Sequence, residues 1–374
     1  MTAAEDPNRR LMVSSVDGFR GLTMLALVIT HYVPPSFFSF NLAKPVVMLL
    51  VLTAGYFLAS VMLSDARHLD GPGRFGAVLR LAVMRHVRVW PAIAGVVGLY
   101  ILLAIVDGGP LTGQILDTWP LYLSYLGNLP KIWFGGEAWP GHFWVIAAQE
   151  QLILFLMLLI SLVGLGPVRR MLWWFVGLGV MARLIGALLY MPANPSLALE
   201  TPLAIADALA LGMIARFAVA NHATRTRVRR IALASGLALL LVWSMLPNTN
   251  SVYFTLVPLA AALLGCALIT TLTDELRAAR LHRFFAHPMI VLLGSMSLSL
   301  FLTHPLVNTV INLLFAKLTG VAIPWWLLLL VGPPASLLFG FLYFRIVETP
   351  IRRWRGRLMR PASGTPGRQR LVRA

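Results

Sequence analysis

The chain has 374 residues, of which 58% are hydrophobic and only 12% are charged, a composition that excludes an ordinary soluble globular domain. The formal net charge of +17 does not indicate a nucleic-acid-binding protein, because the basic residues stand in short segments between apolar runs and do not cover a folded polar face. The single cysteine, Cys266, excludes an intrachain disulfide and is expected to be a small buried side chain.

Apolar runs long enough to cross a bilayer recur along the whole chain. They fall at about 18–40, 44–63, 89–106, 143–164, 171–191, 200–220, 231–247, 252–272, 289–315 and 323–347. We therefore expect an all-α, polytopic membrane protein with about ten transmembrane helices. Its membrane domain is expected at 11–350, between a short polar lead at 1–10 and a basic, largely disordered tail at 351–374.

Arginines cluster in alternate connections between these runs. They occupy 9–10, 67–88, 169–170, 225–230, 277–283 and the tail, whereas the other connections hold little beyond Lys44, Lys131 and Lys317. The positive-inside rule then predicts that both termini are cytoplasmic. The preference for arginine over lysine is typical of a GC-rich bacterial genome, so we expect a multi-pass protein of the bacterial inner (plasma) membrane.

The first run begins with Val16-Asp17-Gly18-Phe19-Arg20-Gly21 and carries His31. Eleven residues at about 1.5 Å each put Arg20 and His31 roughly 16 Å apart on nearly the same helix face. We expect Arg20 at the cytoplasmic membrane edge and His31 at middle depth. The alternative for His31 is a neutral side chain that is hydrogen-bonded to a neighbouring helix.

Three further ionisable residues stand inside apolar runs, namely His304, Arg183 and Glu150. Such residues are costly in a bilayer and usually face a cavity or the bundle interior. We expect a polar cavity in which a histidine accepts a proton while an arginine or glutamate orients a polar substrate. The alternative for Arg183 and Glu150 is a buried ion pair with each other.

The third run opens with Arg85-His86-Val87-Arg88-Val89-Trp90-Pro91. Arg85 and Arg88 share a helix face, and together with Arg20 they would form a pocket for phosphate groups. The alternative is that they act only as topogenic charges. The long outward connection at 107–142 is rich in Trp and Tyr, which predicts an interfacial or re-entrant segment at an extracytoplasmic mouth, or an ordinary aromatic belt.

Five segments resemble the integral-membrane acyltransferase family 3, in the expected order and across residues 16–353. They are Val16-Asp17-Gly18-Phe19-Arg20-Gly21 with His31, Arg85-x-x-Arg88-x-x-Pro91, His142-Phe143-Trp144-Val145-Ile146-Ala147-Ala148-Gln149-Glu150-Gln151, the block from Gly294 to Pro305 that contains His304, and Val347-Glu348-Thr349-Pro350 with Arg352 and Arg353. Gln149 stands where the family more often has its first glutamate, Val145 replaces a serine, and Leu298 replaces a tyrosine. Since one residue turns a helix by about 100°, it is open whether Gln149 or Glu150 faces the cavity.

The resemblance implies transfer of an acyl group, usually acetyl, from cytoplasmic acyl-CoA to a hydroxyl of a carbohydrate or another cell-envelope or secreted acceptor. His31 would be the general base or a transient acyl carrier, with His304 and Glu150 as further catalytic residues. Arg20, Arg85 and Arg88 would hold the donor phosphates of acetyl-CoA. For the acceptor we expect Trp144 to stack on a sugar, with Arg183 and His142 as further contacts.

Two other functions stay open. The first alternative to an acyltransferase is a carrier or flippase for a lipid-linked glycan, with His31, Arg183 and Glu150 as a proton relay. The second is a non-catalytic sensor related to the acyltransferases. Dependence on an acyl-CoA donor separates the enzyme from the carrier. The expected partners are acyl-CoA, a carbohydrate or glycoconjugate acceptor and the lipid bilayer, without nucleic acid or metal; the sequence gives no indication of the oligomeric state.

Overall fold

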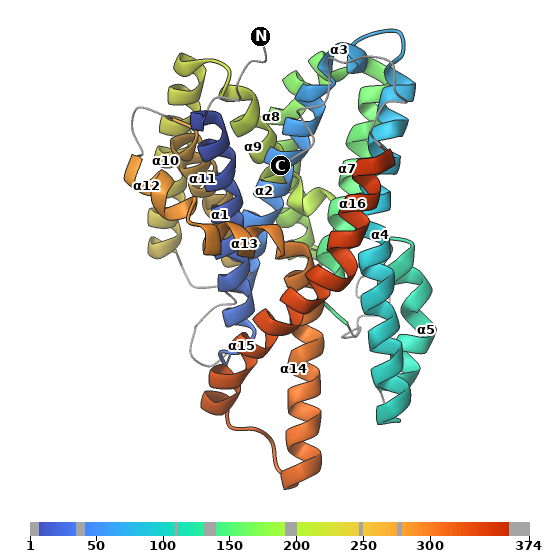
Figure 1. The fold of residues 1–374 in the computed structure, drawn as a ribbon. Helices are drawn as coiled ribbons and strands as arrows, with labels where there is room; N and C mark the ends of the chain where they lie inside the picture. The colour runs from blue at the N-terminus through green and yellow to red at the C-terminus, as the bar shows by residue number, and fades with distance from the viewer. Residues whose placement is uncertain are drawn as a thin grey trace.

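Helices form every regular element in the part of the chain that the structure describes, which is residues 7–34, 42–108, 111–130, 140–190, 200–246, 250–274 and 279–358 of a computed structural model. The α-helices are α1 (Pro7–Thr30), α2 (Ala43–Ser64), α3 (Ala66–Leu69), α4 (Arg74–Asp107), α5 (Leu111–Leu123), α7 (Phe143–Val163), α8 (Leu165–Tyr190), α9 (Ala206–Ala218), α10 (His222–Met245), α11 (Asn250–Leu272), α12 (Ala279–Phe285), α13 (Pro288–Ser295), α14 (Ser297–Thr319), α15 (Trp325–Tyr343) and α16 (Thr349–Leu358). A 3₁₀ turn at Leu203–Ile205 precedes α9, and a π-helical turn at Phe344–Glu348 joins α15 to α16. Figure 1 shows these helices as an elongated bundle.

Eight of the described helices are long and apolar enough to cross a membrane, which confirms the predicted helical, polytopic fold class. The predicted count was about ten. The expected span at 200–220 contains α9, which has 13 residues and would rise only about 20 Å. Its residues are almost all buried, because α9 packs inside the bundle against α2, α8 and α11.

The helix α1 lies at the centre of the arrangement that carries the site, since it packs against α2, α11, α12, α13, α14 and α15 (Figure 1). It begins before the expected span at 18–40, because the polar residue Ser15 is held by the side chain of His282 at 3.2 Å and the carbonyl of Leu272 at 3.4 Å. It ends at Thr30, shortly before Pro34 and Pro35, which cannot continue a helix. Residues 35–41 lie outside the described part.

The predicted run at 289–315 is divided at Met296 into α13 and α14. The helix α13 crosses α1 at very short range, because both helices present glycine at the contact. A methyl group on Gly294 would lie 2.0 Å from the carbonyl oxygen of Asp17, and one on Gly21 would lie 2.5 Å from the carbonyl oxygen of Ile290. This crossing brings the end of α13 beside Arg20.

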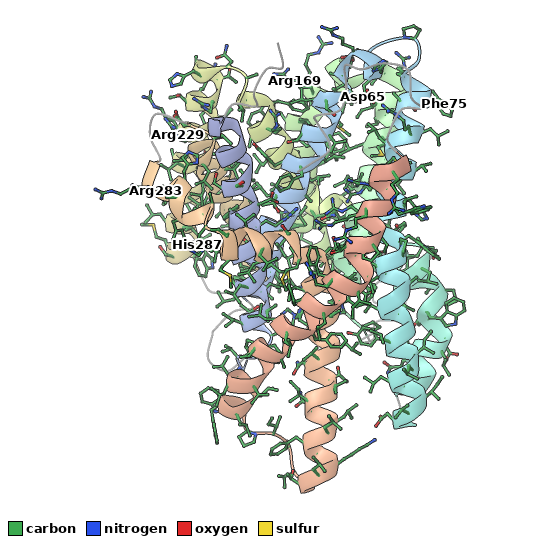
Figure 2. All side chains as sticks on the ribbon, in the orientation of Figure 1. Asp65, Phe75, Arg169, Arg229, Arg283 and His287 are labelled. Atoms are coloured by element: carbon green, nitrogen blue, oxygen red, sulfur yellow. The ribbon has the colours of Figure 1, made fainter. Side chains whose placement is uncertain are left out.

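Charged side chains are unevenly distributed over the two ends of the bundle. Figure 2 shows Asp65, Arg169 and Arg229 toward the end at which α1 begins. At the opposite end, Lys317 of α14 pairs with Asp107 of α4 at 2.9 Å. This distribution agrees with the predicted arginine-rich side, and the cytoplasmic location of both termini stays a prediction.

The expected tail does not begin as disordered chain. The helix α16 continues from the π-helical turn to Leu358, so residues 351–358 are helical, and residues 359–374 lie outside the described part. The apolar residues of this helix are few, and Arg352 is anchored by Glu348, one turn earlier. The proposed lead at 1–10 is likewise helical from Pro7 onward.

Candidate active site

Two histidines from opposite ends of the sequence meet beside α15. His31 follows the last residue of α1, and His304 lies in the second turn of α14; their ring centroids are 4.8 Å apart with an interplanar angle of 79°. His304 is fully buried, whereas His31 is exposed. The pair therefore has an accessible member and a member that packs behind it.

The backbone fixes which ring nitrogen of each histidine carries the proton. His31 Nδ1 lies 2.9 Å from the carbonyl oxygen of Leu27, and His304 Nδ1 lies 2.9 Å from that of Leu300. A carbonyl oxygen only accepts hydrogen bonds, so Nδ1 is the donor in both rings. In the neutral ring, Nε2 then holds the free lone pair, and His31 has the form that a general base requires.

The neighbouring Tyr32 holds His31 in place. Its hydroxyl lies 2.7 Å from the Ser336 hydroxyl of α15 and donates to the His304 carbonyl oxygen at 3.3 Å. Its ring packs directly on Gly332, where a methyl group would lie only 2.1 Å from a ring carbon. The end of α1 is thus tied to both α14 and α15.

A third predicted residue, His142, joins this histidine cluster from the start of α7. Its ring centroid is 5.8 Å from that of His304 and 5.6 Å from that of Phe301. The structure therefore brings together three site residues that are far apart in the sequence. Among the described residues, no group of three His, Cys, Asp or Glu side chains has the geometry of a metal site, and a metal-free reaction stays a prediction.

A second cluster surrounds Arg20, closer to the arginine-rich end of α1. The Arg20 guanidinium donates to Asp17 at 2.7 Å and to the carbonyl oxygen of Gly294 at 2.8 Å. Arg352 of α16 donates to the next carbonyl oxygen, that of Ser295, at 2.6 Å. Both arginines thus satisfy carbonyl groups at the end of α13, where a helix has its negative dipole end.

Glu348 connects this cluster to α4. Its carboxylate is fully buried, accepts hydrogen bonds from Ser299 at 2.7 Å and Arg352 at 2.9 Å, and lies 3.8 Å from the guanidinium of Arg88. It is the last residue of the π-helical turn, a local widening that is frequent at functional sites. No role was predicted for Glu348 or Arg352 from the sequence, although both stand in the closing segment that carries the family resemblance.

The arginine cluster, which we define as Arg20, Arg88 and Arg352, has more positive than negative charge. Its three guanidinium groups face the two carboxylates of Asp17 and Glu348. Arg20 Nε and Arg88 Nε are buried and have no hydrogen-bond partner among the described residues. An incoming anion would gain donors and a net positive charge here.

Arg85 and Glu150 bind each other. The Arg85 Nε donates to Glu150 Oε2 at 2.7 Å, and a second bond from the same guanidinium reaches Glu150 Oε1, so the two form a bidentate pair between α4 and α7. Glu150 is buried, and Gln149 is half-buried beside it. The Arg85 fork is therefore occupied by a carboxylate, and its predicted role in phosphate binding has less support than that of Arg88.

The alternative in which Arg183 and Glu150 form one ion pair is wrong. The guanidinium of Arg183 is fully buried and binds both carboxylate oxygens of Asp207, at 2.7 and 2.6 Å, and the carbonyl oxygen of Ala204 at 2.6 Å. Within the described segments, no contact joins Arg183 to the histidine cluster. A carboxylate in the apolar run at 200–220 was the signal that could have identified this partner.

Trp144 lies inside the bundle, with an exposed fraction of 5%. The ammonium group of Lys44 stands 4.8 Å from the centre of its ring and 3.8 Å from Glu200. A cation already covers the ring that was expected to stack on a sugar, so that role stays a prediction. Of the aromatic residues in the connection at 107–142, Trp133 and Trp139 lie outside the described part.

The site thus combines an accessible histidine, directly after α1, with a cluster of arginines around Arg20 of the same helix. Comparison with known proteins gives an independent result: the family model described as an acyltransferase domain, family 3, matches residues 13–345. No curated protein and no solved structure matches the chain. The match includes His31, His304 and most of the arginine cluster, and it covers most of the sequence, so the chain belongs to acyltransferase family 3.

Proposed function

We propose that this membrane acyltransferase moves an acetyl group from cytoplasmic acetyl-CoA to a hydroxyl group of a cell-envelope or secreted glycan. The observation that carries the proposal is the placement of Arg20 on α1 and of His31 directly after the last residue of that helix. Arg20 belongs to a cluster with excess positive charge, and His31 presents an accessible imidazole about 16 Å further along the axis. One helix thus offers an anion site and a base at the two ends of an extended substrate.

Coenzyme A has the chemistry that this layout requires. Its phosphate groups are separated from the thioester sulfur by a long flexible arm. The phosphates would bind Arg20, Arg88 and Arg352, because guanidinium forks bind phosphate oxygens bidentately. The arm would then follow α1 toward His31, with the acyl carbon beside the imidazole.

The chemistry at His31 is a direct acyl transfer. A hydroxyl group is a weak nucleophile at neutral pH, and His31 Nε2 removes its proton while the oxygen forms a bond to the thioester carbon. The carbon–sulfur bond breaks, and the proton on His31 passes to the departing thiolate. One ester and one thiol form from one thioester and one alcohol, so atoms and charge balance.

His304 and His142 line the buried side of the base. We assign them to orientation of His31 and of the acceptor hydroxyl, since neither is more exposed than His31. The glycan acceptor is supported by the family resemblance and by the location of His31 at the end of α1 that is remote from the arginine-rich end. Acetyl is the proposed acyl group because it is the usual one in the family.

The test is acetyl-CoA binding and thiol release by the purified full-length protein in detergent. We expect Arg88→Ala to lose binding, and His31→Ala to keep binding but to lose thiol release. His287→Ala is the matched control, because His287 is exposed at the start of α13 and its removal should change neither value (Figure 2). A folded wild-type protein that does not bind acetyl-CoA or another acyl-CoA would contradict the proposal and favour a carrier of lipid-linked glycan.

A further inference from the structure

A groove at the arginine-rich end of the bundle lies between α8, α9 and α10. It has a volume of about 620 Å³ and is lined by Arg169 and Trp173 of α8, by Phe217 of α9, and by Arg227 and Ile231 of α10, among others. None of these residues belongs to the histidine cluster or to the arginine cluster. The groove therefore requires an explanation that is separate from acyl transfer.

The arginines of α10 lie on different faces of the helix and make different contacts. Arg225 and Arg229, four residues apart, both bind the buried carboxylate of Asp274, at 3.2 and 2.8 Å. Arg227 stands on another face, in the stripe Ala223, Arg227 and Ile231 that lines the groove. The face of α10 that carries Arg225 and Arg229 thus binds the segment that follows α11. The face that carries Arg227 presents a cation to the groove.

The lining contains cations without a carboxylate. Arg169 and Arg227 are exposed and form no ion pair within the described residues, and the guanidinium of Arg169 stands 5.0 Å from the centre of the Phe217 ring. No Asp or Glu belongs to the described lining. This charge balance favours an anionic ligand.

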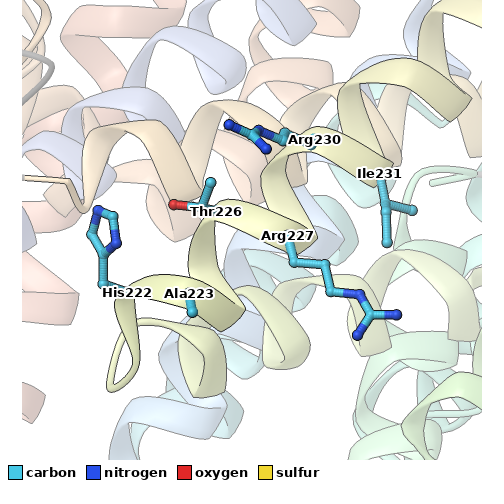
Figure 3. Close-up of a pocket in the computed structure, with 6 residues that line it drawn as sticks. All are labelled: His222, Ala223, Thr226, Arg227, Arg230 and Ile231. Atoms are coloured by element: carbon cyan, nitrogen blue, oxygen red, sulfur yellow. The ribbon is translucent and has the colours of Figure 1, made fainter.

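A second hollow, of about 510 Å³, adjoins the groove across the same stripe of α10 (Figure 3). It is lined by Arg227 and also by Thr226 and Arg230. The Thr226 hydroxyl oxygen is buried and has no hydrogen-bond partner among the described residues. Besides Arg227, the lining of this second hollow thus contains the hydroxyl group of Thr226 and the guanidinium of Arg230.

Apolar side chains continue the groove away from the charges. Trp173 is 53% exposed and Ile231 is 48% exposed, on helices long and apolar enough to span the bilayer. Within the stripe of α10, the order from the helix start is Ala223, Arg227 and Ile231, so the lining changes from charged to apolar along the axis. A ligand that matches both parts has an anionic head and hydrocarbon chains.

We propose that this groove binds an anionic phospholipid of the arginine-rich leaflet. The phosphate group is held by Arg169 and Arg227, and an acyl chain packs along Trp173 and Ile231. Basic pockets between transmembrane helices bind anionic headgroups by the same physics. A free phosphate would use the arginines but would leave the apolar part of the groove uncovered.

The test is native mass spectrometry of the purified full-length protein, titrated with dioleoyl phosphatidylglycerol or with dioleoyl phosphatidylcholine. We expect the wild type to retain phosphatidylglycerol in preference to phosphatidylcholine. The double variant Arg169→Gln/Arg227→Gln should weaken phosphatidylglycerol binding roughly 10- to 30-fold. Arg169→Lys/Arg227→Lys should keep most of the preference.

The matched control is Arg280→Gln/Arg283→Gln on α12. It removes the same charge from two exposed arginines outside the groove, one of which is labelled in Figure 2, and should bind lipid as the wild type does. Equal losses in the groove variant and in the control would overturn the proposal. Glycerol phosphate that displaces the lipid at similar concentration would also overturn it, because the site would then recognise only the phosphate.

Discussion

His31 and His304 form an edge-to-face pair in which the exposed ring rests on the buried one, 4.8 Å between ring centroids. Each ring uses Nδ1 for the carbonyl oxygen four residues earlier in the chain. The helical backbones of α1 and α14 therefore set both ring orientations. Since the two imidazoles are in contact, a change at one is expected to act on the reaction through the other.

The first prediction concerns this coupling. His31→Ala should reduce acetyl transfer by roughly 10²- to 10⁴-fold, the usual contribution of a general base. His304→Ala should reduce it by about tenfold, within the range of coupling energies for residues in contact. The double variant should be no worse than His31→Ala, because His304 acts through His31. Thiol release under saturating acetyl-CoA measures all three.

His287→Ala serves as the control for loss of an imidazole elsewhere in the chain. Losses that multiply in the double variant would show that His304 acts on the substrate independently of His31. Acetyl-CoA affinity should stay near the wild-type value in every one of these variants, since the histidine cluster is separate from the arginine cluster.

The second prediction concerns Arg352, which bonds the Ser295 carbonyl oxygen and Glu348 beside Arg88. Arg352→Gln should weaken acetyl-CoA binding roughly 10- to 100-fold, because hydrogen bonds to charged groups contribute about 1.5–3 kcal/mol. The wild-type affinity should also decrease as salt concentration rises. Isothermal titration with acetyl-CoA at two salt concentrations provides both values.

Arg353→Gln is the matched control, because Arg353 follows on the same helix, is exposed and carries the same charge. It should leave the affinity within about twofold of the wild type, since exposed charges contribute little. An equal loss in both variants would mean that the net charge of α16, and not the position of Arg352, governs donor binding.

The sequence allowed prediction of the helical membrane fold and of the location of His31 and His304 within apolar runs. The length of an apolar run predicts a membrane-spanning helix, and the direction in which that helix crosses the membrane predicts the depth of its polar residues. The contact between the two rings depends on how α1, α14 and α15 pack, which no local pattern contains. The division at Met296 and the early start of α1 are tertiary effects of the same kind.

The partners of the charged residues were harder to predict. An ion pair between Glu150 and Arg183 was the alternative to a polar cavity, because both residues lie inside apolar runs. Instead, Glu150 binds Arg85 and Arg183 binds Asp207. The partner of a buried arginine can be chosen among several carboxylates only when the neighbouring helices are known. The sequence of a span indicates how deep a residue lies, but not toward which neighbouring helix it points. Glu348 was overlooked for a related reason, since a π-helical turn rotates it relative to a regular helix.

The third prediction concerns the pair of Arg183 and Asp207, both fully buried. Arg183→Met should lower the free energy of unfolding by roughly 3–5 kcal/mol, because it leaves an uncompensated buried charge. The double variant Arg183→Met/Asp207→Leu should recover most of that loss. Thermal unfolding of the purified protein in detergent provides the comparison.

Lys317→Met is the control for loss of a cation from an ion pair at a bundle end. Lys317 pairs with Asp107 but is mostly exposed, so its removal should hardly change the unfolding temperature. A double variant that is no more stable than Arg183→Met would show that the pair is required for packing of α8 on α9 and not merely for charge balance.

The last prediction concerns the crossing of α1 and α13 at Gly294. Gly294→Ala places a methyl group 2.0 Å from the Asp17 carbonyl oxygen, so the two helices must separate. The Arg20 hydrogen bond to the Gly294 carbonyl oxygen would then lengthen from 2.8 Å, and the arginine cluster would lose its alignment. We expect a lower unfolding temperature together with weaker acetyl-CoA binding, measured on the same preparation.

Gly98→Ala is the matched control within α4, because no described atom beyond the chain neighbours and the adjacent backbone of α4 lies within 4 Å of its added methyl group. Replacing glycine by alanine in an open helical position should stabilise the helix, by about 0.5–1 kcal/mol. Acetyl-CoA affinity should not change in this variant. If Gly294→Ala were as stable and bound as tightly as the control, the close crossing of α1 and α13 would not be what aligns Arg20, and the arginine cluster would have to be held by Glu348 and α16 alone.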